Sequence, residues 1–449
     1  MSENKKIYKP RPISGYPEWL PEFRAVEQLW LDKIRSTYES YGYCNIETPA
    51  VEELEVIAAK GEDVDKEIYV LERLQADENE KKEARLALHF DQTVPFARYV
   101  AQHFNDLTFP FKRYQMQKVW RGERPQMGRM REFYQCDIDV INVDHLPLSF
   151  DAEVAAICYE ALEALDIGRV QLRISNRKII SGFLEDWGVQ DITAVLRILD
   201  KAEKVGEGQT FNDLSKICSP TNWGEDWTAA NMLMGLAKIK ASTSNELKSK
   251  INALKMKPLT SKHLEGIEEL SFVLDQLSHL PEGAVVADLS IVRGLDYYTG
   301  TVYETQLLDV PEFTGSVCSG GRYDDLAGSY INKKLPGVGI SIGFSRLFDV
   351  LRQTGKIQPG AKSPAHILMA LPEEETRARA AQTARILRAK GYNVENFHAP
   401  QKIGKQIAYA EKKGIPYVWF PFADGHKVKN LKTGEQIEAA PEDWSLQDD

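Results

Sequence analysis

Cysteine is scarce in this 449-residue sequence, and its five cysteines never occur as a CxxC pair. An odd number of scattered thiols argues against a disulfide framework, and the missing CxxC spacing argues against a structural zinc site. Reduced, buried thiols of a cytosolic protein are the expected state. These residues are Cys44, Cys136, Cys158, Cys218 and Cys318.

Long hydrophobic runs are also missing. The stretch MSENKKIYKPRP lacks the apolar core of a signal peptide, and no apolar segment approaches the roughly 18 residues that span a bilayer. A Walker A loop is absent too, which argues against a P-loop nucleotide-binding protein. We therefore expect a cytoplasmic protein without membrane segments.

Excess positive charge is absent as well. Lys and Arg number 56 against 66 Asp and Glu, so the formal net charge is −10. Such a chain is not a general nucleic-acid binder, and any RNA-binding bases must be gathered locally. Residues 376–413 hold nine bases and two acids, a local net charge of +7. This stretch is either an RNA-binding surface or two ordinary solvated helices; its bases are Arg377, Arg379, Arg385, Arg388, Lys390, Lys402, Lys405, Lys412 and Lys413.

The length predicts two or three domains. Residues 23–41 have apolar side chains at helical spacing, and 111–120 and 131–142 indicate two strands of a long-looped antiparallel hairpin. Beyond a Gly- and Pro-containing linker, strands alternate with helices, which implies a mostly parallel sheet. We therefore expect a main domain formed by 1–177 and 285–353, a helical insertion at 178–284, a linker at 354–365 and a C-terminal α/β domain at 366–449.

The second strand of the hairpin has one unusual face. Because side chains alternate along a strand, Glu132, Tyr134, Cys136, Ile138 and Val140 share one face, and this mostly apolar set should pack on the core. The other face carries an arginine, a phenyl ring, an amide and two carboxylates, with Arg121 and Glu123 entering from the loop. It could bind a polar molecule, or it could be an exposed face with ion pairs. Its residues are Arg131, Phe133, Gln135, Asp137 and Asp139.

Three further segments could bind a ligand. In RGLDYYTGTVYE (293–304), Arg293 follows an apolar strand, and only one of the adjacent Tyr297 and Tyr298 can face a ligand in an extended chain. In CSGGRYDDL (318–326) and GVGISIGFSRL (337–347), small residues allow close approach to the backbone, and Arg346 begins a helix. In LHFDQTVPFARYV (88–100), Asp91 and Thr93 could cap a helix or bind an ammonium group. Each segment alone also has a purely structural interpretation.

Together, and in this order, these segments resemble the class II aminoacyl-tRNA synthetases. The helix–strand element ending at Pro49 resembles motif 1, RGE (121–123) with REFYQCDID resembles motif 2, and GVGISIGFSRL resembles motif 3. RGLDYY, GGRYD and DQTVPFARY resemble the segments typical of histidyl-tRNA synthetases. Gln92 and the opening SGYPEWLPEF depart from the usual pattern. The resemblance implies an α+β class II catalytic core, an antiparallel sheet flanked by helices, with a helical insertion and a C-terminal α/β anticodon-binding domain.

The resemblance also implies roles for individual residues. Arg121, Arg293 and Arg346 would be catalytic, and ATP, escorted by Mg²⁺, would contact Arg121, Glu123, Arg131, Phe133 and Arg346. Histidine would be bound by Asp91, Gln92, Thr93, Arg121, Gln135, Asp139, Arg293, Tyr297 and Tyr298. The partner tRNA(His) would contact Arg124, Gln126, Arg129, Arg388 and Lys405. No protein-bound metal site is expected, and motif 1 implies a homodimer.

Two alternatives remain open. One is a catalytically inert paralogue, either a regulatory subunit of histidine biosynthesis or a sensor of uncharged tRNA. The other is a class II synthetase for a different amino acid, although Gln135, Asp139 and Tyr298 suit an imidazole better than an aliphatic side chain. The class I signatures HIGH and KMSKS are absent.

Overall fold

The computed structural model describes residues 8–58, 67–74, 86–218, 229–254, 261–292, 298–324, 327–328 and 330–446. By contacts the chain forms two compact units, residues 1–17 with 32–357 and residues 18–31 with 358–449. Among the described residues, no helix has both the length and the apolar character needed to cross a bilayer. All five cysteines are free; four are buried, whereas Cys44 is exposed, contrary to expectation.

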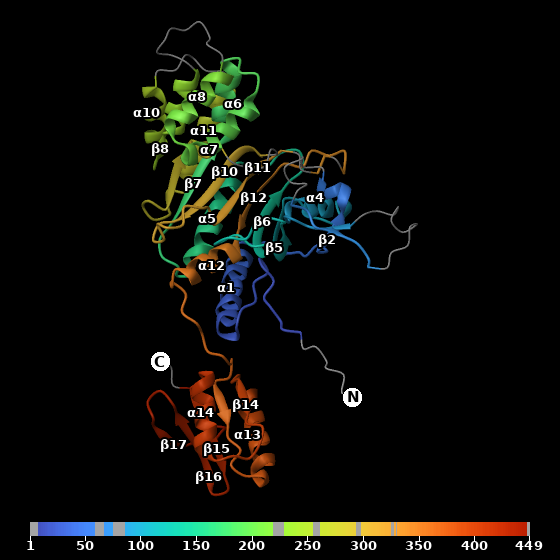
Figure 1. Cartoon of the computed structure of the whole chain (residues 1–449), viewed down its shortest axis with the longest axis vertical. Coiled ribbons are helices and arrows are strands. Elements are labelled where there is room, and N and C mark those ends of the chain that lie inside the picture. Colours follow the sequence, from blue (N-terminus) through green and yellow to red (C-terminus); the bar gives the residue numbers. More distant parts are fainter. Residues whose placement is uncertain are drawn as a thin grey trace. The chain divides into compact units, whose positions relative to one another are not determined.

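The first unit is built on a nine-stranded sheet in the order β1-β5-β6-β12-β11-β10-β7-β9-β8 (Figure 1). Neighbouring strands from β5 to β7 are antiparallel, and the parallel pairs β1/β5 and β7/β9 lie toward its ends. This agrees with the predicted antiparallel core. The strands are β1 (Cys44–Asn45), β5 (Phe111–Trp120), β6 (Glu132–Ile141), β7 (Val170–Asn176), β8 (Lys240–Ala241), β9 (Val285–Asp288), β10 (Tyr298–Leu307), β11 (Cys318–Tyr323) and β12 (Gly337–Ile342).

Helices cover one face of this sheet. Helix α5 (Ser149–Glu163) is joined to β11 by a buried ion pair, 2.6 Å between the Arg322 Nη2 and Asp151 Oδ2 atoms. Helix α12 (Phe344–Gln353) packs on β6 on the same side. The C-terminal half of α1 (Pro21–Ser40) also contacts strand β6, because the Tyr38 hydroxyl donates to the Cys136 carbonyl at 3.1 Å. The opposite face is covered in part by Phe96, which packs on Phe111 and Arg113, and it lines a cavity at Gln135 and Ser341.

Smaller elements border the face of the sheet opposite α5 and α12. A three-stranded sheet, β2-β4-β3, is formed by Val51–Glu53, Leu86–Leu88 and Val70–Leu71. Helix α2 (Leu54–Ala58) follows β2, and α4 (Thr93–Gln102) follows β4. The segment Phe90–Gln92 leads into α4 and lies against the β5–β6 hairpin, since the Arg121 Nε donates to the Phe90 carbonyl at 3.0 Å.

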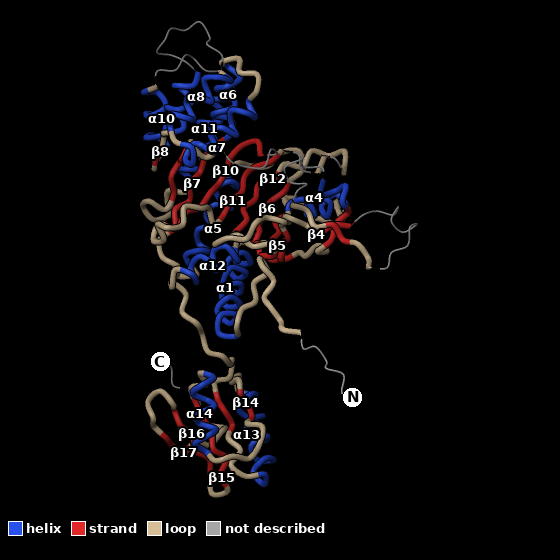
Figure 2. Tube along the Cα trace, viewed as in Figure 1, coloured by secondary structure: helices blue, strands red, loops and turns tan. Residues whose placement is uncertain are grey.

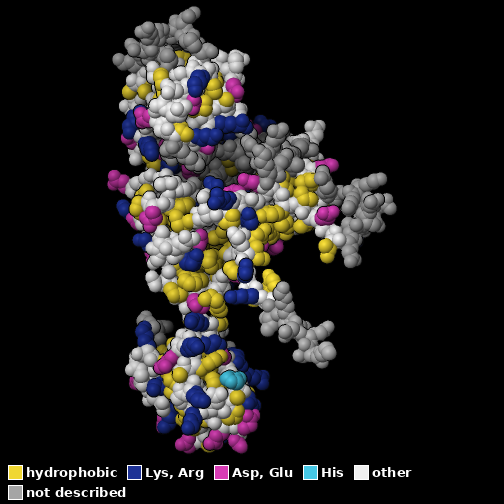
Figure 3. Space-filling view, viewed as in Figure 1, with side chains coloured by type: hydrophobic (Ala, Val, Ile, Leu, Met, Phe, Trp, Pro, Cys, Tyr) yellow, Lys and Arg dark blue, Asp and Glu magenta, His cyan; other side chains and the backbone are white. Residues whose placement is uncertain are grey.

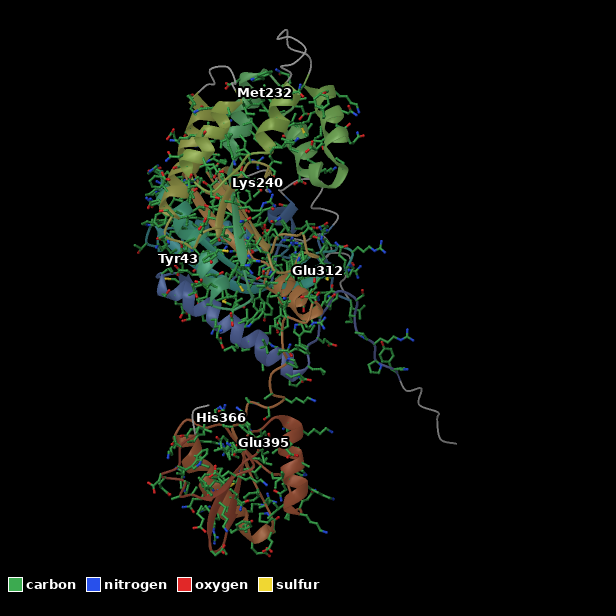
Figure 4. All side chains as sticks on the ribbon, turned by 90° about the vertical axis from the view of Figure 1, so that its left-hand side faces the viewer. Tyr43, Met232, Lys240, Glu312, His366 and Glu395 are labelled. Carbon is green, nitrogen blue, oxygen red and sulfur yellow. The ribbon has the colours of Figure 1, made fainter. Side chains whose placement is uncertain are left out.

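The segment between β7 and β9 is mainly helical, as its Leu/Lys/Glu/Ala pattern predicts (Figure 2). Local caps begin several helices; the Asp191 carboxylate, for example, accepts from the Ala194 amide at 2.9 Å. One feature was not predicted: the two-residue strand β8, whose Lys240 pairs with Asp288 of β9 at 3.0 Å (Figure 4). Two residues are too few to show alternation. The helices are α6 (Arg177–Asp186), α7 (Ile192–Val205), α8 (Glu207–Ile217), α9 (Ala229–Ala237), α10 (Ser244–Ala253) and α11 (Ser261–Gln276).

The second unit contains a five-stranded sheet in the order β14-β13-β15-β16-β17. Strands β13 (Ile367–Met369), β14 (Val394–Asn396) and β15 (Tyr417–Phe422) are parallel, as predicted, whereas β16 (Gly425–Asn430) and β17 (Gln436–Glu438) form an antiparallel hairpin. Helix α13 (Arg377–Ala389), preceded by the 3-10 turn Glu374–Thr376, and helix α14 (Ile403–Lys413) contribute to separate cores. Alternate residues of β13 belong to these two cores, so the helices cover opposite faces.

Candidate active site

The β5–β6 hairpin forms the base of the site. Every residue of Phe111–Trp120 pairs with a residue of Glu132–Ile141, and Arg113 stands opposite Asp139. Cys136, Ile138 and Val140 are buried in the core, as predicted, whereas Tyr134 is only half-buried. The polar face is also buried: Gln135, Asp137 and Asp139 are only 9%, 3% and 4% exposed. The alternative of an exposed face with ion pairs is therefore wrong for these three residues.

Three buried carboxylates meet one buried guanidinium on this face. Burial raises the pKa of Asp137 to about 7 and that of Asp139 to about 6, while the nearby Arg113 lowers both and Asp91 raises both. One Asp137 oxygen, Oδ1, has no hydrogen-bond partner among the described residues. Uncompensated carboxylates in a buried site favour a ligand that carries positive charge or N–H donors.

Two glycines form the floor between Asp139 and Tyr298. Gly339 of β12 pairs with both Asp139 and Gly321, so the three residues lie in one row across the sheet. A Cβ atom on Gly339 would lie 2.0 Å from the Asp139 Oδ1, and one on Gly321 would lie 2.8 Å from the Tyr298 Cδ1. The carboxylate and the phenol ring therefore lie over neighbouring glycines on the same face.

The segment that leads into α4 adds polar groups beside the β5–β6 hairpin. The Asp91 Oδ1 accepts from the Val94 amide at 3.1 Å, so this carboxylate does cap the helix. The Gln92 amide donates to the carbonyls of Gln117 and Gln135, at 2.9 and 3.2 Å, which ties α4 to the hairpin. Thr93 is half-buried at the first helical position. Burial of the Asp91 carboxylate in addition to its capping bond is compatible with both interpretations of this segment.

Gln135 links the carboxylates to a second part of the site. Its amide donates to the Ser341 hydroxyl at 2.6 Å, and its Oε1 atom has no partner within the described part of the chain. Gln135 and Ser341 both line a cavity that opens toward the motif 2 loop. The other lining residues are Arg121, Glu123, Gly128, Arg129, Met130, Phe133, Ser316, Val317, Ser319, Gly343 and Arg346.

Three guanidinium groups face this cavity. Arg121 lies over the Phe133 ring, with its Cζ atom 5.1 Å from the ring centroid. Arg346 is held by the carbonyls of Gly128 and Ser316, at 2.9 and 3.0 Å. Burial, together with repulsion from Arg121 and Arg129, lowers the pKa of Arg346. Such a cluster is suited to bind the oxygens of an anion, while the Phe133 ring offers a stacking surface.

The Glu123 carboxylate pairs with the Arg129 side chain at 3.2 Å. Arg129 was predicted only as a tRNA contact, and the structure also places it in the cavity lining. Arg131 does not line the cavity: its side chain packs on Gly15, and its Nε donates to the Glu123 carbonyl at 3.2 Å. Arg124 and Gln126 are exposed in the loop. Arg293 and Tyr297 lie outside the described residues.

Several site residues were not identified from the sequence, namely Arg113, Tyr323 and Ser341. The Tyr323 hydroxyl donates to the Asp139 Oδ1 at 3.2 Å. Arg113 alternates with Gln115 and Gln117 along β5, and this polar series of period two is a signal that could have revealed it. Among the described residues, no group of three His, Cys, Asp or Glu side chains could hold a metal ion.

In the second unit, many of the predicted RNA-binding bases have internal partners. Arg388 donates to the Val394 carbonyl, 3.2 Å from its Nε, and Lys390 donates to three carbonyls of the 441–444 segment. Lys413 pairs with Glu395 at 2.9 Å (Figure 4), and Arg377 pairs with Glu374. Lys405 is exposed, as are Arg385, Lys402 and Lys412. Figure 3 shows Lys and Arg side chains over much of the visible face of this unit.

Comparison with known proteins identifies relatives over nearly the whole chain. A family model described as histidyl-tRNA synthetase matches residues 15–347, and one described as an anticodon binding domain matches 364–420. The histidine--tRNA ligase of Thermobifida fusca (strain YX) is 53% identical over 448 residues, which cover 99% of this chain and all of that protein. The crystal structure of histidyl-tRNA synthetase from Nostoc sp. PCC 7120 superposes with a TM-score of 0.85 at 39% identity, covering 97% of each chain.

A more distant likeness concerns the inert alternative. A structure described as an ATP phosphoribosyltransferase regulatory subunit/histidyl-tRNA synthetase from Bacillus halodurans C has a TM-score of 0.72 at 22% identity, covering 90% of this chain and 97% of that one. At this identity the likeness shows the fold alone.

Proposed function

The chain belongs to the histidyl-tRNA synthetase family, and we propose that the glycine-floored pocket is the place where it recognises histidine. As a member of this family, the chain activates histidine with ATP and charges tRNA(His), releasing AMP and diphosphate. The observation that carries the proposal is the row Asp139, Gly339, Gly321, with a buried carboxylate over one glycine and the Tyr298 ring over the other.

The imidazole would lie between Asp139 and Tyr298. A neutral imidazole has one N–H donor and one acceptor nitrogen. The Asp139 carboxylate would accept from the N–H, and the Tyr298 hydroxyl would donate to the other nitrogen. The α-ammonium group would meet Asp91, Thr93 and Gln135, and Gln92 and Tyr297 remain proposed histidine contacts. This arrangement accounts for the excess of buried carboxylates, because the ligand brings the missing positive charge.

ATP would occupy the cavity beside the motif 2 loop. Phe133 and Arg346 would cover the two faces of adenine, Glu123 would accept from its amino group, and Arg121 and Arg293 would bind the α-phosphate. The histidine carboxylate is already a nucleophile, so adenylation needs positioning and charge stabilisation rather than a general base. Guanidinium groups held in place before the reaction stabilise the extra negative charge at phosphorus without reorganising. Arg131, which packs away from the cavity, is the weakest of the proposed ATP contacts.

The remaining partners are proposed from the family. Mg²⁺ would arrive with ATP, because magnesium commonly binds through substrate phosphates and one or two carboxylates. The acceptor end of tRNA(His) would meet Arg124, Gln126 and Arg129, and the second unit would read the anticodon through exposed bases such as Lys405. A homodimer through motif 1 is supported by β1, whose two exposed residues form an edge of the large sheet. A cytoplasmic location and the four-part domain division stay predictions.

The inert-paralogue alternative has no observation in its favour. The chain keeps both the segment RGLDYY and a C-terminal domain. A synthetase for another amino acid is disfavoured by the family match.

The decisive experiment is the substitution Asp139→Asn, assayed by ATP–pyrophosphate exchange. It replaces the charged acceptor of the imidazole N–H by a neutral amide, so we expect the KM for histidine to rise roughly 100-fold or more, in line with the loss of a charge-assisted bond at a buried site. The KM for ATP should stay within about 3-fold.

The matched control is Asp288→Asn, which removes another buried carboxylate, the partner of Arg173 on β7 and β9. It should reduce stability without changing the KM for histidine selectively. An unchanged KM for histidine in the Asp139→Asn variant would show that the imidazole is bound elsewhere.

A further inference from the structure

We propose that Arg113 is a positioning residue for histidine recognition: it keeps the Asp139 carboxylate ionised and oriented toward the imidazole N–H. This inference rests on the proposed role of Asp139. Arg113 itself need not touch the substrate, because it stands behind the carboxylate on the neighbouring strand β5.

The placement of Arg113 is specific. Its side chain is fully buried, and its Nη2 lies 2.5 Å from the Asp139 Oδ2, a close ion pair rather than a well-aligned hydrogen bond. The guanidinium lies over the Phe96 ring, with 4.4 Å between the Arg113 Cζ and the ring centroid. A further contact, 3.5 Å from Nη1 to the Gln115 Oε1, is long. The ring and the strand therefore leave Arg113 little freedom to face anything but the carboxylates.

The charges around Asp139 explain why a cation is needed there. Asp139 is buried beside Asp137 and Asp91, and burial together with like charge favours the protonated form of a carboxyl group. A protonated carboxyl group keeps an acceptor oxygen, but it lacks the negative charge that strengthens the bond from the imidazole N–H. Arg113 opposes this by stabilising the ionised form. Without Arg113, the site would lose the charge of its acceptor rather than merely a packing partner.

The carboxylate still has room for the substrate. Arg113 holds Oδ2, and the Tyr323 hydroxyl donates to Oδ1 at 3.2 Å. An ionised carboxylate offers about four lone-pair positions, so lone pairs remain for an imidazole N–H. Arg113 and Tyr323 approach from different strands, β5 and β11, and orient the carboxyl group over Gly339.

The test compares Arg113→Met, Arg113→Lys and the double variant Arg113→Met/Asp139→Asn with Asp139→Asn alone, in the full-length protein by ATP–pyrophosphate exchange. Arg113→Met should raise the KM for histidine roughly 30-fold, with the KM for ATP within about 3-fold, since the variant weakens only the acceptor for the imidazole N–H. Arg113→Lys keeps the charge and should restore much of the histidine affinity.

The double variant measures whether Arg113 acts through Asp139. If it does, adding Arg113→Met to Asp139→Asn should change the KM for histidine by less than about 3-fold, because the two effects are not additive. The double variant also removes both buried charges, so it keeps the test open if Arg113→Met alone does not fold. The inference would be overturned if the effects were additive, so that the double variant had a KM for histidine roughly 10-fold or more above that of Asp139→Asn alone.

Arg173→Met provides the matched control. It removes a buried arginine paired with Asp288 at 2.7 Å, on strand β7 of the same sheet. A purely structural role for Arg113 predicts that both arginine variants lose thermal stability and activity without a selective change in the KM for histidine. If Asp139→Asn raises this KM and Arg113→Met does not, only the role of Arg113 is refuted. If Asp139→Asn leaves the KM for histidine unchanged, the proposed recognition of histidine by this pocket is itself refuted.

Discussion

At the scale of single residues, the site is defined by buried carboxyl groups whose pKa values burial raises. Asp137 is the clearest case, because burial raises its pKa to about 7 and its Oδ1 has no hydrogen-bond partner in the described part of the chain. Ionised Asp137 therefore costs folding free energy in the empty protein. Active sites commonly keep such unfavourable groups because the ligand compensates them.

Asp137→Asn should stabilise the empty protein at high pH. The pKa of Asp137 is higher in the folded state than its ordinary 3.8, so the folded protein binds this proton more tightly than the unfolded chain does. Stability is then lost as pH rises from the unfolded pKa toward the folded pKa, and the loss is complete above pH 7. At pH 8.5 we expect the variant to melt about 3 °C or more above the wild type, measured by differential scanning fluorimetry.

The difference between Asp137→Asn and the wild type should shrink toward pH 5, where the wild-type carboxyl is protonated. Asp288→Asn gives a contrast of opposite sign, because folding lowers the pKa of Asp288 through its bonds to Ser290, Arg173 and Lys240. That variant should be destabilised most at high pH. A gap between Asp137→Asn and the wild type that widens on acidification would contradict the assigned cause.

At the scale of elements, the pocket depends on two neighbouring strand positions that carry no side chain, Gly339 and Gly321. β12 places Gly339 beside Asp139, and β11 places Gly321 beneath Tyr298. The two strands pair in register, so the glycines lie next to each other. A ligand can approach the sheet closely only where such residues coincide on adjacent strands.

Gly339→Ala should damage histidine binding without unfolding the sheet. The new Cβ would lie 2.0 Å from the Asp139 Oδ1 and 2.7 Å from the Ile138 carbonyl oxygen, so the carboxylate must move and the β6–β12 pairing must shift locally. We expect the KM for histidine to rise roughly 10- to 100-fold with the KM for ATP little changed, the signature of a misplaced binding group. Ile340→Val, on the other face of β12, should cost about 1 kcal/mol of stability and leave both constants near wild type. Equal kinetic effects in the two variants would argue against the glycine floor.

Elements with a long periodic pattern were predicted well. The strand predicted at 111–120 matches β5, and 131–142 matches β6 within one residue at each end, because ten alternating residues carry a clear signal. The strand β8 was missed, because tertiary pairing rather than local pattern defines a strand of two residues. Tyr323 was not predicted for the same reason, because its hydroxyl contacts Asp139 from two strands away in the sheet.

At the scale of the whole molecule, RNA binding must come from local clusters because the chain carries a net charge of −10. The nine bases of 376–413 do not act as one surface, since internal acids and carbonyls already occupy several of them. Lys402, Lys405 and Lys412 are exposed at or along α14. Their spacing of three and seven residues places them on one side of the helix.

Reversing these three charges, with Lys402, Lys405 and Lys412 changed to Glu, should weaken tRNA charging but not histidine activation. We expect the KM for tRNA(His) to rise roughly 10-fold or more, and the dependence of binding on salt to become shallower by about 0.7–0.9 for each phosphate that a lysine no longer neutralises. ATP–pyrophosphate exchange serves as the internal control and should be unchanged. An unaltered KM for tRNA would place anticodon binding on a different face of the second unit.

The sequence by itself determined the elements of this protein and the chemical types of its site residues. Hydrophobic periodicity specifies which face of each strand is buried, and ordered motifs such as RGE, REFYQCDID and GVGISIGF specify the family. Only the tertiary structure decided which charges meet. The contacts of Asp139 with Arg113, Gly339 and Tyr323 join four strands, β6, β5, β12 and β11, from distant parts of the chain. Electrostatic interactions depend on distance and burial, and neither quantity exists until the strands have paired.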